Sequence, residues 1–297
     1  MSPTGGRASN RSETMLRSLR DQGFQLVPWD GTGIYVVDSA NRVIVGGGTP
    51  QDQEGWRAVV EAGAAALVHA RAACSFTEKQ RFHRRGAFPT LAAGFAYGLG
   101  QIRPTATAQV PANQVPVQNL LSDPCIRRIA GFQSSLFHAY APRLWNYYHE
   151  ATTAILTSQP ELQPNFANSV YSSVTFNCGP QTVTVPHIDY LNLAGGLCAI
   201  TALGDFDPDA GGHLILWDLR IVLRFPPGAT ILIPSSLIRH SNVPIQSGEQ
   251  RFSITQYSAG GLFRWADNGL CSDAQRRRGG KPVEERWKST MDLFERR

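Results

Sequence analysis

The sequence predicts an α+β protein built around an antiparallel jelly-roll or cupin-like barrel. Its second half contains short apolar runs at regular spacing, separated by Gly, Pro and Asp, which is typical of such barrels. Its first half contains longer segments with apolar residues three and four positions apart, which indicate amphipathic helices. The expected order is therefore an N-terminal α/β extension followed by the barrel.

The N-terminal α/β region is expected to span residues 1–110. Its first 12 or so residues are polar, and we expect them to be disordered. The predicted elements are a short helix at Thr14–Arg20, a hairpin of Ile34–Asp38 with Arg42–Val45, and an Ala-rich helix at Trp56–Cys74. Residues 103–118 contain three prolines among small polar residues and predict a surface connection.

The core is expected to span residues 111–270, and a basic tail residues 271–297. Leu120–Leu156 predicts two helical stretches at the start of the core. The strands are expected at Gln181–Pro186, Ala199–Leu203, Gly211–Trp217, Ile221–Phe225, Ala229–Pro234 and Arg251–Tyr257.

A candidate metal site is formed by His187 and Asp189, in an H-x-D motif, together with the distant His240. Residues i and i+2 of a strand project to the same face, so the first two side chains can share a metal. Two imidazoles and one carboxylate are the ligands of the facial triad that suits Fe(II), because three positions stay open for a co-substrate and O2. The three residues are therefore the predicted metal ligands and catalytic centre.

A candidate co-substrate anchor follows on the last predicted strand. The Arg251 guanidinium could hold the far carboxylate of 2-oxoglutarate with two parallel hydrogen bonds. Ser253, at i+2, would point the same way and add a hydroxyl donor.

These residues resemble the Fe(II)/2-oxoglutarate dioxygenases, and within them the TET/JBP group that oxidises methyl groups of nucleic-acid bases. The motifs that carry the resemblance are H-x-D-x-x-N, ending at Asn192, and R-x-S-x-x-x-Y, ending at Tyr257. The stretch from Phe166 to Trp265 is most similar to the TET/JBP-related proteins that basidiomycete fungi carry in many copies, often beside transposons. The resemblance is strong in the C-terminal half and weak in the first half.

The resemblance implies a double-stranded β-helix buttressed by helices, with Fe(II), 2-oxoglutarate and O2 as cofactor and co-substrates and ascorbate as reductant. It implies that Arg251 and Ser253 hold 2-oxoglutarate, and that Asn192 and Tyr257 contact and stack on a flipped base. The expected substrate is methylated duplex DNA, with 5-methylcytosine or N6-methyladenine extruded into the pocket.

Two departures from the family pattern are visible. The five cysteines are scattered and form no C-x-x-C motif, so we expect no structural zinc. TET-like enzymes have a histidine two positions after the stacking tyrosine, where this chain has Ala259. Base recognition is therefore expected to differ from that of other TET-like enzymes.

Several residues allow a second interpretation. Asn192 could cap the turn after the metal ligands, and Tyr257 could be an ordinary inward-facing barrel residue. Asn177 could donate to 2-oxoglutarate, as an asparagine does in some related dioxygenases, or organise the turn that follows it.

The charge of the chain permits nucleic-acid binding. The net charge is +5, with one basic run from Lys79 to Arg85 and a second containing Arg276, Arg277, Arg278, Lys281, Arg286 and Lys288. Such runs can neutralise phosphates, and Arg84 and Arg85 are the predicted DNA contacts; a solvated loop or a nuclear-import signal is the alternative. No long apolar segment or apolar leader is visible, so an intracellular, nuclear protein with no membrane partner is expected.

Two other functions remain open from the sequence. The same chemistry could act on a protein side chain or a small molecule. The chain could also be a catalytically inactive, DNA-binding paralogue that keeps the metal-site residues.

Overall fold

The computed structural model describes residues 6–276 and 283–296. Its helices are α1 (Gly6–Asp21), α2 (Gln53–Ala73), α3 (Glu78–Arg81), a 3-10 turn (Pro111–Asn113), α4 (Gln114–Ser122), α5 (Pro124–Tyr140), α6 (Pro142–Ser158), α7 (Gly260–Asp267) and α8 (Val283–Met291). Its strands are β1 (Gln25–Val27), β2 (Ile34–Val37), β3 (Val43–Gly48), β4 (Phe82–His83), β5 (Gly86–Ala87), β6 (Thr90–Ala96), β7 (Thr105–Ala106), β8 (Ser173–Asn177), β9 (Cys198–Asp205), β10 (Leu214–Leu216), β11 (Ile221–Leu223), β12 (Thr230–Ile233), β13 (His240–Asn242) and β14 (Gln250–Tyr257).

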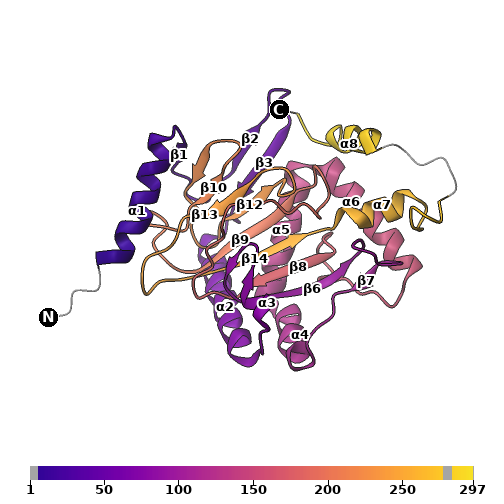
Figure 1. Ribbon diagram of the computed structural model, residues 1–297, viewed down its shortest axis with the longest axis horizontal. Coiled ribbons are helices and arrows are strands. Elements are labelled where there is room, and N and C mark those ends of the chain that lie inside the picture. The colour runs from indigo at the N-terminus through magenta and orange to yellow at the C-terminus, as the bar shows by residue number, and fades with distance from the viewer. Residues whose placement is uncertain (1–5, 277–282, 297) are drawn as a thin grey trace.

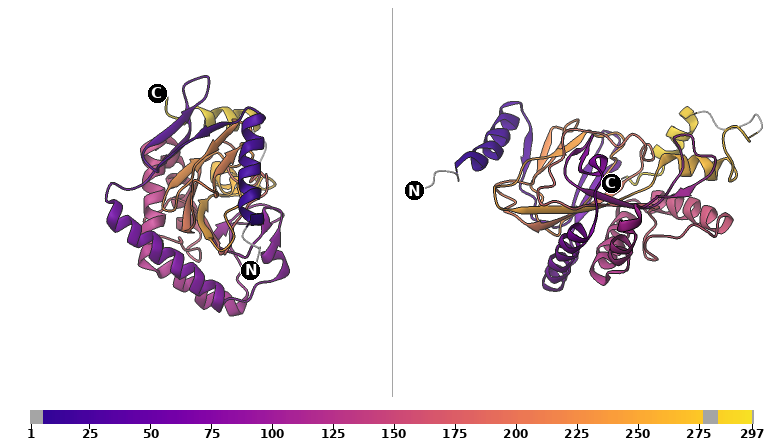
Figure 2. Two further views of the ribbon diagram at one scale, coloured as in Figure 1. Left: turned by 90° about the vertical axis from the view of Figure 1, so that its left-hand side faces the viewer. Right: turned by 60° about the horizontal axis from the view of Figure 1, so that its bottom comes forward.

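Two sheets form the barrel. The larger has the order β2-β3-β12-β9-β14-β8-β6-β7, and the smaller has the order β1-β11-β10-β13. Helices α2 and α5 contact β9 and cover the outer face of the larger sheet, whereas α1 and α8 lie at opposite ends of the molecule (Figures 1 and 2). The α+β double-stranded β-helix buttressed by helices is therefore confirmed.

Successive side chains of strand β14 point alternately to the helix-covered face and to the inner face of the large sheet. Phe252 and Ile254 pack with α2, α4 and α5 on one side of the large sheet. Arg251, Ser253 and Thr255 point to the other side, into a cavity that the small sheet also lines. Because successive side chains of a strand point to opposite faces, one strand both anchors the helices and lines the site.

The N-terminal region shares its sheets with the core. Strands β2 and β3 form the predicted hairpin and then pair with β12, while β6 pairs with β8. Hydrogen-bonded sheets therefore run across the expected boundary at residue 110. Helix α1 begins at Gly6 and so includes residues 6–12, for which the sequence predicts disorder; the first five residues lie outside the described part.

Other elements differ from the sequence-based expectations in their bounds. Helix α2 matches the predicted Trp56–Cys74 closely, and α5 and α6 are the two helical stretches predicted within Leu120–Leu156, with the end of α4 preceding them. The predicted strand Gln181–Pro186 is wrong: the segment is extended but makes only isolated bridges. Its backbone bonds are shared among three different partners, β13, the β4–β5 hairpin and β14, so no regular ladder forms.

The basic tail is described only in part. Arg277, Arg278 and Lys281 lie outside the described residues, as does the side chain of Arg286. Among the helices that the structure describes, none combines the length and the apolar character needed to cross a membrane.

Candidate functional site

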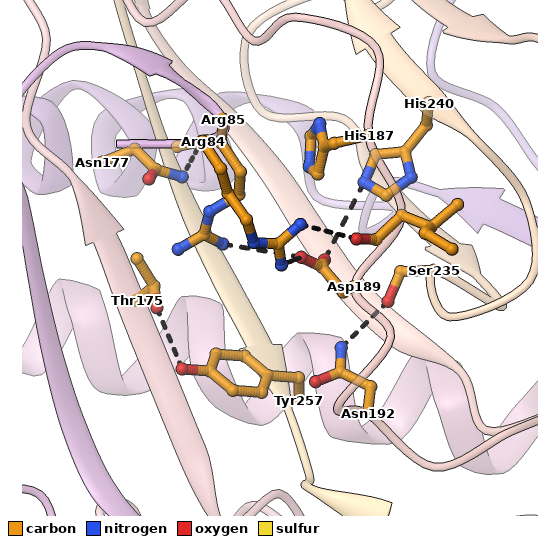
Figure 3. A network of polar contacts seen from close by, with 12 residues as sticks. Arg84, Arg85, Thr175, Asn177, His187, Asp189, Asn192, Ser235, His240 and Tyr257 are labelled. Atoms are coloured by element: carbon orange, nitrogen blue, oxygen red, sulfur yellow. Dashed lines mark hydrogen bonds and ion pairs between the residues drawn. The ribbon is translucent and has the colours of Figure 1, made fainter. Parts of the chain in front are cut away.

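The three predicted metal ligands lie together at one end of the barrel. His187 and His240 form an isolated antiparallel bridge, with backbone N–H···O distances of 3.1 and 2.9 Å, and the Asp189 N–H donates to the Ser235 carbonyl at 2.8 Å. One ligand atom from each of the three side chains lies within 4.8 Å of the others (Figure 3). The bridge to His240, rather than a regular strand, brings the H-x-D motif to the second histidine.

Hydrogen bonds orient both imidazoles for metal binding. Nδ1 of His187 donates to the Val185 carbonyl at 2.7 Å, and Nδ1 of His240 donates to the Ile238 carbonyl at 2.9 Å. A carbonyl can only accept, so each neutral ring carries its proton on Nδ1 and leaves the Nε2 lone pair available.

Burial keeps these rings neutral. It lowers the pKa of His187 to about 4, with the neighbouring His240 adding to the effect, and it also lowers the pKa of His240. Neutral imidazole is the form that binds a metal, so little proton displacement is needed at neutral pH.

Arg84, which is partly exposed, and Arg85 both lie beside Asp189. Arg84 donates from Nη1 to the Ile188 carbonyl at 2.7 Å and from Nη2 to Asp189 Oδ1 at 3.0 Å, and Arg85 Nη1 is 4.0 Å from the same oxygen (Figure 3). Asp189 Oδ2 lies 3.9 Å from His240 Nε2. The arginines thus occupy one carboxylate oxygen and leave the other facing the histidines.

The predicted co-substrate residues line the cavity next to the metal ligands. Arg251 is 1% exposed, donates from Nη1 to the Thr182 carbonyl at 3.0 Å, and has no hydrogen-bond partner at Nε. Its guanidinium lies 5.9 Å from the ring centroids of both Phe206 and Phe225. Burial lowers its pKa to about 10, which still leaves the group charged at neutral pH.

Asn177 and Ser253 form a pair on adjacent strands. They lie opposite each other in the register of β8 and β14, and Asn177 Nδ2 donates to Ser253 Oγ at 2.8 Å. Both line the cavity together with Arg251. The side chain of Asn177 therefore points into the barrel and toward Ser253.

The two predicted base contacts lie on the same side of the metal ligands (Figure 3). Asn192 Nδ2 donates to Ser235 Oγ at 2.9 Å, and its backbone N–H closes a turn onto the Asp189 carbonyl. The Tyr257 hydroxyl accepts a hydrogen bond from Thr175 Oγ1 at 3.2 Å, and its half-buried ring packs against the barrel core. Each residue thus has a structural partner and also borders the site.

Sequence reasoning missed several residues of this cavity. Thr255, Thr184, Asn242 and Phe88 also line it, and Thr184 Oγ1 donates to Asn242 Oδ1 at 2.8 Å. Thr255 could have been found, because it continues the i, i+2 series from Arg251 and Ser253. The other three come from separate segments and have no local signal.

The residues present fit both an iron ion and 2-oxoglutarate. Two oriented Nε2 atoms and one carboxylate oxygen provide three of six positions of an octahedral metal. Arg251 is a buried cation, and among the described residues no carboxylate forms an ion pair with it. A dicarboxylate that chelates the metal and reaches Arg251 would satisfy both groups.

Comparisons with known proteins support the fold. No protein-family model matches the sequence, and no curated protein is similar to it. The structure is similar to that of NgTET1 in complex with 5mC DNA, with a TM-score of 0.55 and 16% identity over 87% of this chain and 92% of that chain.

Two further solved structures are more distant. An oxidoreductase of the 2OG-Fe(II) oxygenase family from Burkholderia pseudomallei has a TM-score of 0.34 and 14% identity over 67% of this chain and 80% of its own. The viral collagen prolyl hydroxylase vCPH from Paramecium Bursaria Chlorella virus-1, in its 2OG complex, has a TM-score of 0.23 and 16% identity over 29% of this chain and 57% of its own. The likeness to NgTET1 supports the fold, and this fold carries the HxD…H set of His187, Asp189 and His240 that could hold a metal ion.

Proposed function

We propose that this protein is an Fe(II)/2-oxoglutarate-dependent dioxygenase that oxidises methylated bases in DNA, through a base flipped out of the duplex. One observation carries the proposal: the oriented His187–Asp189–His240 triad and the Arg251 guanidinium line the same cavity. The guanidinium is buried, and no described carboxylate neutralises its charge. A metal ligand set alone would suit many reactions. An added buried cation with no counter-ion is what a dicarboxylate co-substrate requires.

The residues of the site have two separate binding roles. His187, Asp189 and His240 would hold iron, and Arg251, assisted by Ser253 and Asn177, would hold the far carboxylate of 2-oxoglutarate. Bound iron would supply the activation of O2, with 2-oxoglutarate as the source of electrons and ascorbate keeping the iron reduced. The apolar walls around Arg251, including Phe206 and Phe225, would exclude water and strengthen its attraction for a carboxylate.

DNA is the proposed substrate because the sequence motifs resemble those of the TET/JBP group and the similar solved structure is a complex with DNA. NgTET1 is bound to 5mC DNA, so 5-methylcytosine is the first base to test and N6-methyladenine the second. Among the described residues, no donor is hydrogen-bonded to the Asn192 amide oxygen, and we propose that this oxygen accepts a hydrogen bond from the flipped base. Tyr257 would present its ring to the base while Thr175 holds its hydroxyl.

Two finer assignments belong to the same proposal. The likeness to the multicopy, transposon-associated basidiomycete group rests on the sequence motifs around Asn177, Gly212 and Gly261. A substrate in chromosomal DNA would place the enzyme in the nucleus.

The proposal is tested by incubating the purified protein with Fe(II), ascorbate, 2-oxoglutarate and duplex DNA that contains either methylated base. Nucleosides and succinate are then quantified by mass spectrometry. We expect 5-hydroxymethylcytosine, or adenine from N6-methyladenine, in the wild type and neither in Asp189→Ala, which lacks a metal ligand. Succinate without an altered base would indicate another substrate class, and DNA binding without succinate would indicate an inactive paralogue.

A further inference from the structure

A cavity separate from the metal site lies between the end of α2 and the β4–β5 hairpin. Its volume is about 440 Å³, and the residues on its walls include Arg71, Cys74, Phe76, Arg81, Phe82 and Phe88. Among the residues that the structure describes, no aspartate or glutamate lines it. The cavity is therefore a positively charged hollow with aromatic walls.

The two arginines have unused hydrogen-bonding capacity. Arg71 Nη1 makes one contact of 3.5 Å with the Cys178 carbonyl, and Arg81 Nε makes one of 3.4 Å with the Phe76 carbonyl. Neither forms an ion pair within the described residues, although ten pairs between an arginine and a carboxylate are present there. A guanidinium has five N–H donors, so both can still bind an anion with two parallel bonds.

An exposed aromatic ring borders these arginines. Phe82 is 65% exposed although it belongs to strand β4, whereas Phe88 at the other end of the hairpin is buried. Beneath Arg81, the Phe76 ring centroid lies 6.0 Å from the guanidinium carbon. Guanidinium groups beside an exposed aromatic ring are suited to a ligand that carries both negative charge and a flat apolar surface.

The hairpin connects this cavity to the metal centre. Phe88 lines both cavities, and the Arg85 carbonyl accepts a hydrogen bond from Val185 N–H at 2.9 Å, two residues before His187. Arg84 and Arg85, which were the predicted phosphate contacts, are instead directed at Asp189. The neighbouring Arg71 and Arg81 remain available to an external anion.

We propose that this cavity binds the sugar–phosphate backbone of the nucleic-acid strand whose base is presented to the metal centre. Arg71 and Arg81 bind phosphate oxygens, and Phe82 packs against a sugar or base of the same strand. The assignment of the strand rests on the proposed function, but the charge and the aromatic wall do not. The DNA contact is thus assigned to Arg71 and Arg81, and not to Arg84 and Arg85, which lie beside Asp189.

Salt dependence of DNA binding tests this proposal. Affinity for a fluorescently labelled duplex containing 5-methylcytosine is measured by anisotropy over a series of KCl concentrations, with the full chain. Each lost phosphate contact makes the slope of log K against log[KCl] less steep by about 1. We therefore expect this change in Arg71→Gln and in Arg81→Gln, and about twice the change in the double variant.

Arg57→Gln is the matched control. Arg57 is exposed on the same helix, and it lies about 21 Å from Arg71 at 1.5 Å per residue. It should leave the slope unchanged. Phe82→Ala should weaken binding without changing the slope, because the ring contact displaces no counter-ion.

An unchanged slope in the double variant, or a change no larger than that of Arg57→Gln, would overturn the proposal, as would a wild-type protein that binds no DNA. The proposed function fails separately. If the protein oxidises the base but the variants leave the salt slope unchanged, only the proposed backbone site is contradicted. If the slopes change as expected but no base is oxidised, only the proposed activity is contradicted.

Discussion

Arg251 is a charged side chain buried inside the barrel, and no carboxylate in the described part of the chain forms an ion pair with it. Its guanidinium donates a hydrogen bond to the Thr182 main-chain carbonyl, and two aromatic rings flank it. Removing a charge from water costs several kcal/mol unless a partner offsets it. The residue is therefore a source of instability in the free protein and of affinity in the complex with a carboxylate.

Replacing Arg251 should separate these two effects. In Arg251→Met we expect the affinity for 2-oxoglutarate, measured by calorimetry with Mn(II) in place of iron, to fall by about 2 kcal/mol or more, roughly thirtyfold in Kd. The unfolding temperature without co-substrate should stay the same or rise. Arg251→Lys should recover the charge but not the paired hydrogen bonds.

Arg224→Met serves as the control, because Arg224 is paired with the exposed Asp209 and does not line the cavity. Unchanged 2-oxoglutarate affinity in Arg251→Met, together with a lower unfolding temperature, would show that the arginine is structural.

At the scale of elements, the approach of β14 to β9 positions Arg251. Gly204 pairs with Arg251 in the register of the two strands and has φ of +114°. A Cβ at Gly204 would lie 2.2 Å from the Gln250 carbonyl oxygen and 3.1 Å from the Arg251 Cα. The glycine therefore permits both the backbone conformation and the close contact.

Gly204→Ala should displace the start of β14. We expect a loss of about 1 kcal/mol from backbone strain and a further 1–3 kcal/mol from the steric clash, measured by urea unfolding. The affinity for 2-oxoglutarate should fall with it, because the clash lies at Arg251.

Gly248→Ala isolates the strain, since Gly248 has φ of +89° but no atom within 4 Å of its added Cβ. Equal losses of stability in the two variants would contradict a role for the close approach.

At the scale of the whole molecule, the site joins parts that are distant in the sequence. His240 lies on the small sheet, Arg251 and Ser253 lie on the large sheet, and His187 and Asp189 lie on the extended segment between β8 and β9. A metal with its co-substrate would bond all three parts at once. Binding to the folded state alone stabilises it by mass action.

Metal and co-substrate should therefore stabilise the fold together. At a hundredfold excess over Kd, Mn(II) with 2-oxoglutarate should add about 2.7 kcal/mol, which is several degrees in Tm for a chain of this size. EDTA should reverse the rise, and Asp189→Ala should abolish it. A rise of the same size in Asp189→Ala would place the metal elsewhere.

The sequence alone predicted the features that depend on local pattern. Apolar spacing located α2 and most barrel strands, because a helix or strand that buries one face must repeat its apolar residues with its own period. The same alternation placed Arg251 and Ser253 on one face of β14. The metal ligands were identifiable because few residue types bind iron and their motif is short.

Only the tertiary structure decided the features that depend on contacts between distant segments. The segment before His187 is not a strand, and its position comes from backbone bonds to Asn242, Arg85 and Arg251. The sharing of sheets between the N-terminal region and the core, and the turning of Arg84 toward Asp189, are likewise long-range contacts. Side-chain periodicity shows which face a residue lies on. It does not specify the partner opposite that face, because the partner is fixed by packing of the whole chain.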